Sequence, residues 1–232
     1  MIVFVPRAGH QDKRPVAAAV AGLAILAALW LGPLVPMSRT AFSPHMLLHL
    51  GVVVAAAPLL GFALARRLPQ PAYPADAIPW YWLAAAFETI AVWGWHIPLL
   101  HDAAAREPGV FVLEQLSFLV AGLALWTAIW AARSRAAAAA AALVSFFTFS
   151  HMTLFGIILT LAPRLLYDPS LCGGAFGLAP LADQQLGGML MAAGGLPYLA
   201  ATAFSISTML SEGRAGASIP STPVAAQRDK VG

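Results

Sequence analysis

Six long apolar stretches, separated by short polar or proline-rich breaks, occupy most of this chain. Each has about 20 residues or more, the length that an α-helix needs to cross a hydrocarbon layer of about 30 Å. In lipid, the backbone N–H and C=O groups of such a segment must bond within the segment, which favours helices. The pattern predicts an all-α polytopic membrane bundle of about six transmembrane helices. The six stretches are residues 16–35, 45–65, 79–100, 110–132, 136–161 and 184–210.

The composition excludes several other classes of protein. Of the 232 residues, 60% are hydrophobic and 10% are charged, whereas soluble domains have about 25% charged residues. So few charges cannot cover a soluble core of this size. A single cysteine, Cys172, cannot form an internal disulfide. An ordinary cytosolic enzyme, a disordered chain and a disulfide-stapled secreted module are therefore excluded.

The distribution of Lys and Arg predicts the orientation in the membrane. Ten of these 13 residues lie in the N-terminal segment, the second-to-third loop, the fourth-to-fifth loop and the tail. Because cytoplasmic loops carry the excess of Lys and Arg, both termini are predicted to be cytoplasmic. We divide the chain into a cytoplasmic N-terminus (1–15), a six-span membrane domain (16–210) and a disordered cytoplasmic tail (211–232). The basic residues are explained by topology, so no nucleic-acid partner is expected.

Polar side chains inside the spans are the main functional candidates, because lipid offers them no hydrogen bonds. With this topology, five of the six histidines fall at the outer side or within the membrane. His45 and His49 lie in the first turns of the second span, where Ser43 is the predicted N-cap. His96 lies at the outer end of the third span, and His151 lies near mid-membrane in the fifth.

The spacing of His45 and His49 suits a metal ion. Residues four apart share one helical face, with their Cβ atoms about 6 Å apart. Imidazole pairs with this spacing chelate metals. Hydrogen bonds to loop carbonyls in the headgroup layer are the alternative for this pair. For His151 the alternative is an interhelical hydrogen bond to Glu88 or Thr89.

We predict that the histidines of three spans converge on one metal ion, with methionine sulfur assisting. Thioether and imidazole ligands favour Cu(I), although packing is the alternative role of the methionines. For His101, which follows Pro98, a surface position is equally compatible with the sequence. Three polar residues are predicted to orient the ligands through hydrogen bonds: Glu114, Asp183 and Gln184. The predicted ligands are His45, His49, His96, His151, Met46 and Met152.

With these residues in view, the chain resembles the multi-span CtaG-type cytochrome c oxidase assembly factors over about residues 40–210. It departs from the family at Gln115, where members often have histidine, so the resemblance assigns no metal ligand there. The motifs that carry the resemblance are Ser-Pro-His-Met-x-x-His (43–49), Ala-Pro-Leu (57–59), Trp-His (95–96), Leu-Glu-Gln-Leu-Ser-Phe (113–118), Ser-His-Met-Thr-Leu-x-Gly (150–156) and Leu-Ala-Asp-Gln-Gln-Leu-Gly-Gly (181–188).

The resemblance implies a non-enzymatic protein of the bacterial inner membrane whose partner is a cytochrome c oxidase subunit. It also implies that the protein handles or delivers copper on the outer side of the membrane. Other functions stay open. A b-type haem protein would use His49 or His96 together with His151 as axial ligands. An intramembrane metal-dependent hydrolase would use three histidines and a carboxylate, and a six-span transporter is a further alternative.

Overall fold

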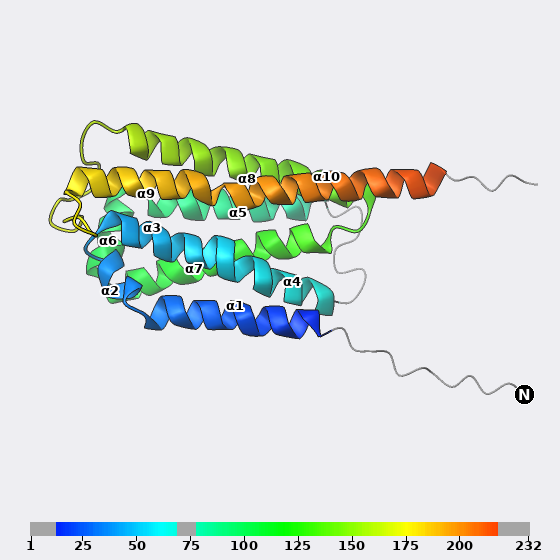
Figure 1. Cartoon of the computed structure of the whole chain (residues 1–232), viewed down its shortest axis with the longest axis horizontal. Helices are drawn as coiled ribbons and strands as arrows, with labels where there is room; N and C mark the ends of the chain where they lie inside the picture. Colours follow the sequence, from blue (N-terminus) through cyan, green and yellow to red (C-terminus); the bar gives the residue numbers. More distant parts are fainter. Residues whose placement is uncertain (1–12, 69–77, 218–232) are drawn as a thin grey trace, which may run out of the picture.

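The computed structural model describes residues 13–68 and 78–217, and within these ranges all regular secondary structure is helical. The long helices run side by side along the long axis of the molecule, with α1 beginning and α10 ending at the same end (Figure 1). In chain order they are α1 (Arg14–Leu31), α2 (Leu34–Ser38), α3 (Phe42–Leu50), the π-helix η1 (Gly51–Ala56), α4 (Ala57–Arg67), α5 (Ile78–Trp95), α6 (Pro98–Arg106), α7 (Pro108–Ala131), α8 (Arg135–Leu161), α9 (Pro180–Gly194) and α10 (Leu196–Ala217).

The predicted membrane bundle is confirmed. Among the described residues, five helical segments are long and apolar enough to cross a membrane, and α5 with α6 makes a sixth if this bent pair counts as one span. Which end of the bundle faces the cytoplasm stays a prediction. Of the two predicted terminal segments, residues 1–12 and 218–232 lie outside the described residues. Helix α10 continues past residue 210 as far as Ala217.

Prolines shorten two of the predicted spans. Helix α1 ends at Leu31 rather than at residue 35, because Pro33 disfavours helical backbone at Gly32, which is extended. Helix α5 ends at Trp95 because Ile97, the residue before Pro98, is also extended. Helix α6 then starts at an angle of 75° to α5. The bend at Pro98 turns the chain across one end of the bundle.

The second span contains the π-helix η1 between α3 and α4. Pro58 has no N–H to donate to the carbonyl of Val54, so the regular α-helical ladder cannot continue through this segment. Two tryptophans of α7 donate instead to carbonyls of the second span: Trp126 Nε1 to Val53 O at 2.8 Å, and Trp130 Nε1 to Pro58 O at 3.0 Å. These two hydrogen bonds hold α7 against the second span at η1. The extra residue in this wide turn also rotates the side chains of α3 by about 100° about the helix axis relative to those of α4.

The surface of the bundle is apolar, and three carboxyl groups lie in its interior. Large aliphatic side chains such as Ile90 and Leu161 are 69% and 73% exposed, whereas Glu88, Glu114 and Asp183 are 0% exposed. A soluble protein has the opposite arrangement. This distribution is the one expected of a bundle surrounded by lipid.

Glycines bring α8 and α9 into backbone contact. A Cβ atom at Gly156 would lie 2.4 Å from the backbone nitrogen of Ala192 and 2.6 Å from the carbonyl oxygen of Gly188. A Cβ atom at Gly188 would in turn lie 2.6 Å from the backbone nitrogen of Thr160. Small residues of this kind let transmembrane helices approach closely. The contact fixes the start of α9 beside the end of α8.

We predict that Gly156→Ala destabilises the bundle, because the added methyl group meets backbone atoms that cannot move independently. The expected loss of unfolding free energy is about 1–3 kcal/mol, measured by thermal unfolding in detergent followed by circular dichroism. Gly94→Ala is the matched control, since a Cβ at Gly94 meets no described atom within 4 Å. Equal melting temperatures for the two variants would contradict the close packing of α8 on α9.

Candidate functional site

Four histidines gather at one end of the bundle, and we name His45, His49, His96 and His101 the histidine cluster. The ring centroid of His45 lies 5.6 Å from that of His96 and 4.8 Å from that of His101. The ring centroids of His49 and His96 are 5.4 Å apart. No member is more than 3% exposed. The structure thus brings together three of the histidines predicted from the sequence and adds His101.

Local geometry explains how three segments supply these rings. His45 and His49 lie one turn apart on α3, as their spacing predicts. His96 lies in the turn between α5 and α6, and His101 lies on α6. The bend at Pro98 returns His101 toward α3, and its 2% exposure rules out a surface position.

The backbone fixes the orientation and tautomer of His96. Its Nδ1 lies 2.5 Å from the carbonyl oxygen of Val92. A carbonyl can only accept, so Nδ1 is the donor, and in the neutral ring Nε2 carries a lone pair. The backbone carbonyl of His96 accepts a hydrogen bond from the Tyr167 hydroxyl at 3.0 Å. A ligand position at Nε2 is therefore preorganised.

Several ring nitrogens of the cluster have no hydrogen-bond partner among the described residues. A buried polar atom without a partner costs about 1–3 kcal/mol, and imidazole nitrogens with free lone pairs are metal ligands. Two carboxylate oxygens lie near these nitrogens, Glu114 Oε1 at 3.6 Å from His45 Nε2 and Asp102 Oδ1 at 3.6 Å from His101 Nδ1, and both distances are longer than a hydrogen bond. These atoms are His45 Nε2, both ring nitrogens of His49, His96 Nε2 and both ring nitrogens of His101.

Aromatic rings enclose the histidine cluster. The ring of Phe118 is 4.1 Å from His49, Phe155 is 5.0 Å from His96, and Tyr167 is 4.4 Å from His101, measured between centroids. These walls exclude water and keep the local dielectric low, which strengthens any charge interaction inside. Within the part of the chain that the structure describes, no three His, Cys, Asp or Glu side chains are already arranged to hold a metal ion.

Asp183 of α9 anchors the start of α3. Its carboxylate accepts hydrogen bonds from the backbone N–H groups of Phe42, at 2.7 Å, and Ser43, at 3.2 Å, and from the Ser43 hydroxyl. The prediction that Ser43 is the N-cap is wrong, because α3 begins at Phe42 and its N-cap is Ala41. Asp183, distant in sequence, supplies the acceptor that the helix N-terminus needs. It thereby positions the helix that carries His45.

The other two residues predicted to orient ligands hold neighbouring segments. Gln184 accepts from the backbone N–H of Leu166 at 2.8 Å and donates to the carbonyl of Arg164 at 3.3 Å, which ties the loop before α9 to that helix. Glu114 faces His45 with one oxygen and accepts from Gln115 Nε2 at 3.2 Å with the other. Of the three predicted residues, Glu114 is the one that lies beside an imidazole.

His151 lies in a separate polar group. Its Nε2 is 3.0 Å from Glu88 Oε2 and 3.2 Å from Thr89 Oγ1, and its Nδ1 accepts from Trp93 Nε1 at 3.2 Å. This is the interhelical hydrogen bonding that the sequence offered as the alternative to metal ligation. Phe155 contacts both groups, with its ring 5.1 Å from that of Trp93 and 5.0 Å from that of His96.

The family model for the cytochrome c oxidase caa3 assembly factor (Caa3_CtaG) matches residues 2–212. The chain belongs to this family. Its resemblance to the multi-span CtaG proteins is therefore confirmed, and the match includes every residue of the histidine cluster. Neither the curated proteins nor the solved structures contain a match to the chain.

The two methionines predicted to assist a metal in this CtaG-family protein are both fully buried. Met46 points toward α9, where its Cγ would lie 3.1 Å from a Cβ at Gly187. Met152 belongs to the apolar core of the bundle. Both positions are compatible with the packing role that the sequence left open.

A loop of residues 162–179 covers the histidine end of the bundle. The ring of Tyr167 stacks on Phe42 at 4.7 Å, and the N–H of Gly173 donates to Thr40 O at 2.9 Å. Cys172 is 1% exposed, and burial, with the nearby charges of three aspartates, raises the pKa of its thiol to about 12. By contrast, hydrogen bonds from Ser170 and the charge of Arg106 lower the pKa of Asp168, which is half-buried.

We predict that Cys172 resists alkylation in the folded protein. The thiolate is the reactive form, and at pH 8 a thiol with the raised pKa has about 10³-fold less thiolate than a free cysteine. Labelling with iodoacetamide, followed by mass spectrometry of the intact chain, is expected to be slow until SDS unfolds the protein. Labelling of the folded protein at the rate of free cysteine would contradict the buried position of Cys172.

Proposed function

We propose that this protein is a non-enzymatic assembly factor that holds copper as cargo at the histidine cluster and delivers it to a cytochrome c oxidase subunit. Membership of the oxidase assembly family supports the oxidase as the destination. The chemistry of the cluster supports copper as the cargo. The protein performs no bond-breaking reaction in this proposal, because its role is to bind and release an ion.

The observation that carries the proposal is a set of four buried imidazoles, each with at least one ring nitrogen that lacks a partner among the described residues. Imidazole suits copper among the transition metals. The water-excluding aromatic walls favour a cation of low charge, because burying charge is costly. Cu(I) carries one positive charge, and the carboxyl group of Glu114, 3.6 Å from His45, can balance it.

The spacing of the rings fits a weak, exchangeable site. Two imidazoles that bind one metal through bonds of about 2 Å place their ring centroids about 6 Å apart when the metal lies on the line between them. The three pairs within the cluster are separated by 4.8–5.6 Å. Small ring rotations would therefore create a two-ligand site, a coordination number that Cu(I) accepts. A site with few ligands releases its ion readily to a partner.

We further propose that the histidine cluster faces the outer side of a bacterial inner membrane. Basic residues lie at the opposite end of the bundle, where α1 and α8 begin and α4 ends: Lys13, Arg14, Arg66, Arg67, Arg133 and Arg135. At the histidine end, the guanidinium of Arg106 lies 2.5 Å from the carboxylate of Asp168, which offsets its charge. The excess of positive charge at the far end favours that end as cytoplasmic.

The proposal predicts that His49→Ala and His96→Ala each weaken Cu(I) binding by about ten-fold or more, since each removes a ligand from the cluster. The measurement is competition between purified protein in detergent and a Cu(I) chelator of known affinity. His151→Gln is the matched control, because His151 is equally polar and nearly as buried but bonds to Glu88 and Trp93 instead. It is expected to leave copper affinity unchanged.

Two results would reject the copper assignment: unchanged affinity in both cluster variants, or an equal loss in His151→Gln. Circular dichroism of each variant separates loss of a ligand from loss of the fold. Delivery of copper to the oxidase is tested separately, by the copper content of the oxidase. In cells that depend on this protein, His49→Ala is expected to lower the copper content of the isolated oxidase, and a normal copper content would contradict delivery.

A further inference from the structure

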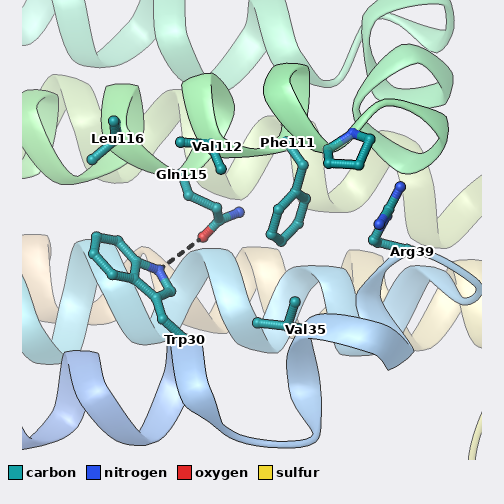
Figure 2. Close-up of a pocket in the computed structure, with 8 residues that line it drawn as sticks. Trp30, Val35, Arg39, Phe111, Val112, Gln115 and Leu116 are labelled. Atoms are coloured by element: carbon teal, nitrogen blue, oxygen red, sulfur yellow. Dashed lines mark hydrogen bonds between the residues drawn. The ribbon is translucent and has the colours of Figure 1, made fainter.

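A groove of about 350 Å³ lies between the first two helices and α7. Figure 2 shows Trp30 and Val35 on one side and Phe111, Val112 and Leu116 on the other. Val112 and Leu116 are 54% and 46% exposed, so the groove opens on the lipid-facing surface of the bundle. Its walls are almost entirely apolar.

One cationic side chain, Arg39, lies at the end of this groove (Figure 2). Its Nε donates to the carbonyl of Ala105 at 2.9 Å, and its Nη2 donates to the carbonyl of Arg106 at 2.8 Å. A guanidinium has five N–H donors, and the other three have no partner among the residues that the structure describes. Arg39 is thus held in place by backbone carbonyls while its charge and three donors stay available to an anion.

The size of the groove decides which kind of ligand fits. One turn of an α-helix with its side chains, about 10 Å across and 5.4 Å long, occupies about 400 Å³. The groove has room for one or two such turns at most, so it cannot enclose the several turns of a transmembrane helix. Its volume falls instead in the range of small-molecule pockets, about 300–1,000 Å³. A flexible hydrocarbon chain fits a narrow apolar groove of this volume.

We propose that the groove binds one acyl chain of an anionic phospholipid, whose phosphate contacts the guanidinium of Arg39. The apolar walls match the chain, and the positive charge at one end matches the phosphate, which arginine binds through paired N–H donors. Basic pockets beside transmembrane helices recognise anionic headgroups in the same way. This site is distinct from the histidine cluster and does not depend on copper binding.

The polar floor of the groove connects it to the cluster. Trp30 Nε1 donates across the groove to Gln115 Oε1 at 3.3 Å, and Gln115 Nε2 donates to Glu114 at 3.2 Å. Glu114 in turn faces His45 at 3.6 Å. A lipid chain in the groove covers the hydrogen bond between Trp30 and Gln115 and shields it from competing water. The lipid therefore supports the side chain that holds Glu114.

Native mass spectrometry of the purified full chain, with dioleoyl phosphatidylglycerol or dioleoyl phosphatidylcholine added in detergent, tests the site. We expect wild type to retain at least five-fold more of the anionic lipid. Arg39→Gln is expected to remove this preference, and Val112→Trp to reduce retention of both lipids by filling the groove. Leu113→Trp is the matched control, because Leu113 is 59% exposed but does not line the groove.

Retention that is equal in wild type, Val112→Trp and Leu113→Trp would overturn the proposal. So would a second copy of the chain bound in place of lipid, visible as a dimer whose formation Val112→Trp abolishes. If Arg39→Gln fails to fold, as judged by circular dichroism, the comparison of Val112→Trp with Leu113→Trp still decides whether the groove holds a chain. The preference of wild type for phosphatidylglycerol over phosphatidylcholine then decides whether charge is recognised.

Discussion

In a hydrocarbon surrounding, a polar side chain must find its partner inside the bundle, and this requirement determines how the helices of this protein pair. Three fully buried carboxyl groups show it. Asp183 of α9 binds the backbone at the start of α3, Glu88 of α5 binds His151 of α8, and Glu114 of α7 faces His45 of α3. Each contact joins two different helices. Apolar packing alone would leave the rotation of each helix about its axis poorly specified, because lipid and core are equally apolar.

The histidine cluster depends on departures from straight helices. His101 follows His96 by five residues, so in a continuous helix it would lie about 7.5 Å further along the axis and away from α3. The 75° bend at Pro98 places it 4.8 Å from His45 instead. The same backbone break leaves His96 in a turn, where its carbonyl is accessible to Tyr167. The bend at Pro98 therefore determines the positions of two members of the cluster, His96 and His101.

The sequence was sufficient for the all-helical membrane bundle of five or six spans, for the shared face of His45 and His49, and for Glu88 and Thr89 as candidate partners of His151. These features depend on hydrophobic length, helical period and depth in the membrane, which follow from local sequence. The burial of His101 and the capping of α3 by Asp183 instead of Ser43 did not follow. Both depend on the bend angle and rotation of helices that meet only in three dimensions, and a single sequence gives no measure of either.

The hydrogen-bond partners of their ring nitrogens distinguish the histidine that joins helices from the histidines that are available to a ligand. Both ring nitrogens of His151 are engaged, by Glu88 and Thr89 on one side and by Trp93 on the other, so replacing any of these bonds with a metal bond would leave a buried carboxyl or indole unpaired. The histidine cluster has six buried ring nitrogens without a hydrogen-bond partner among the described residues, so an ion bound there would gain ligands without breaking an existing bond. Membrane depth and residue type, which the two groups share, do not distinguish them. The free-energy cost of unpaired buried atoms does, and it favours an ion at the cluster over an ion at His151.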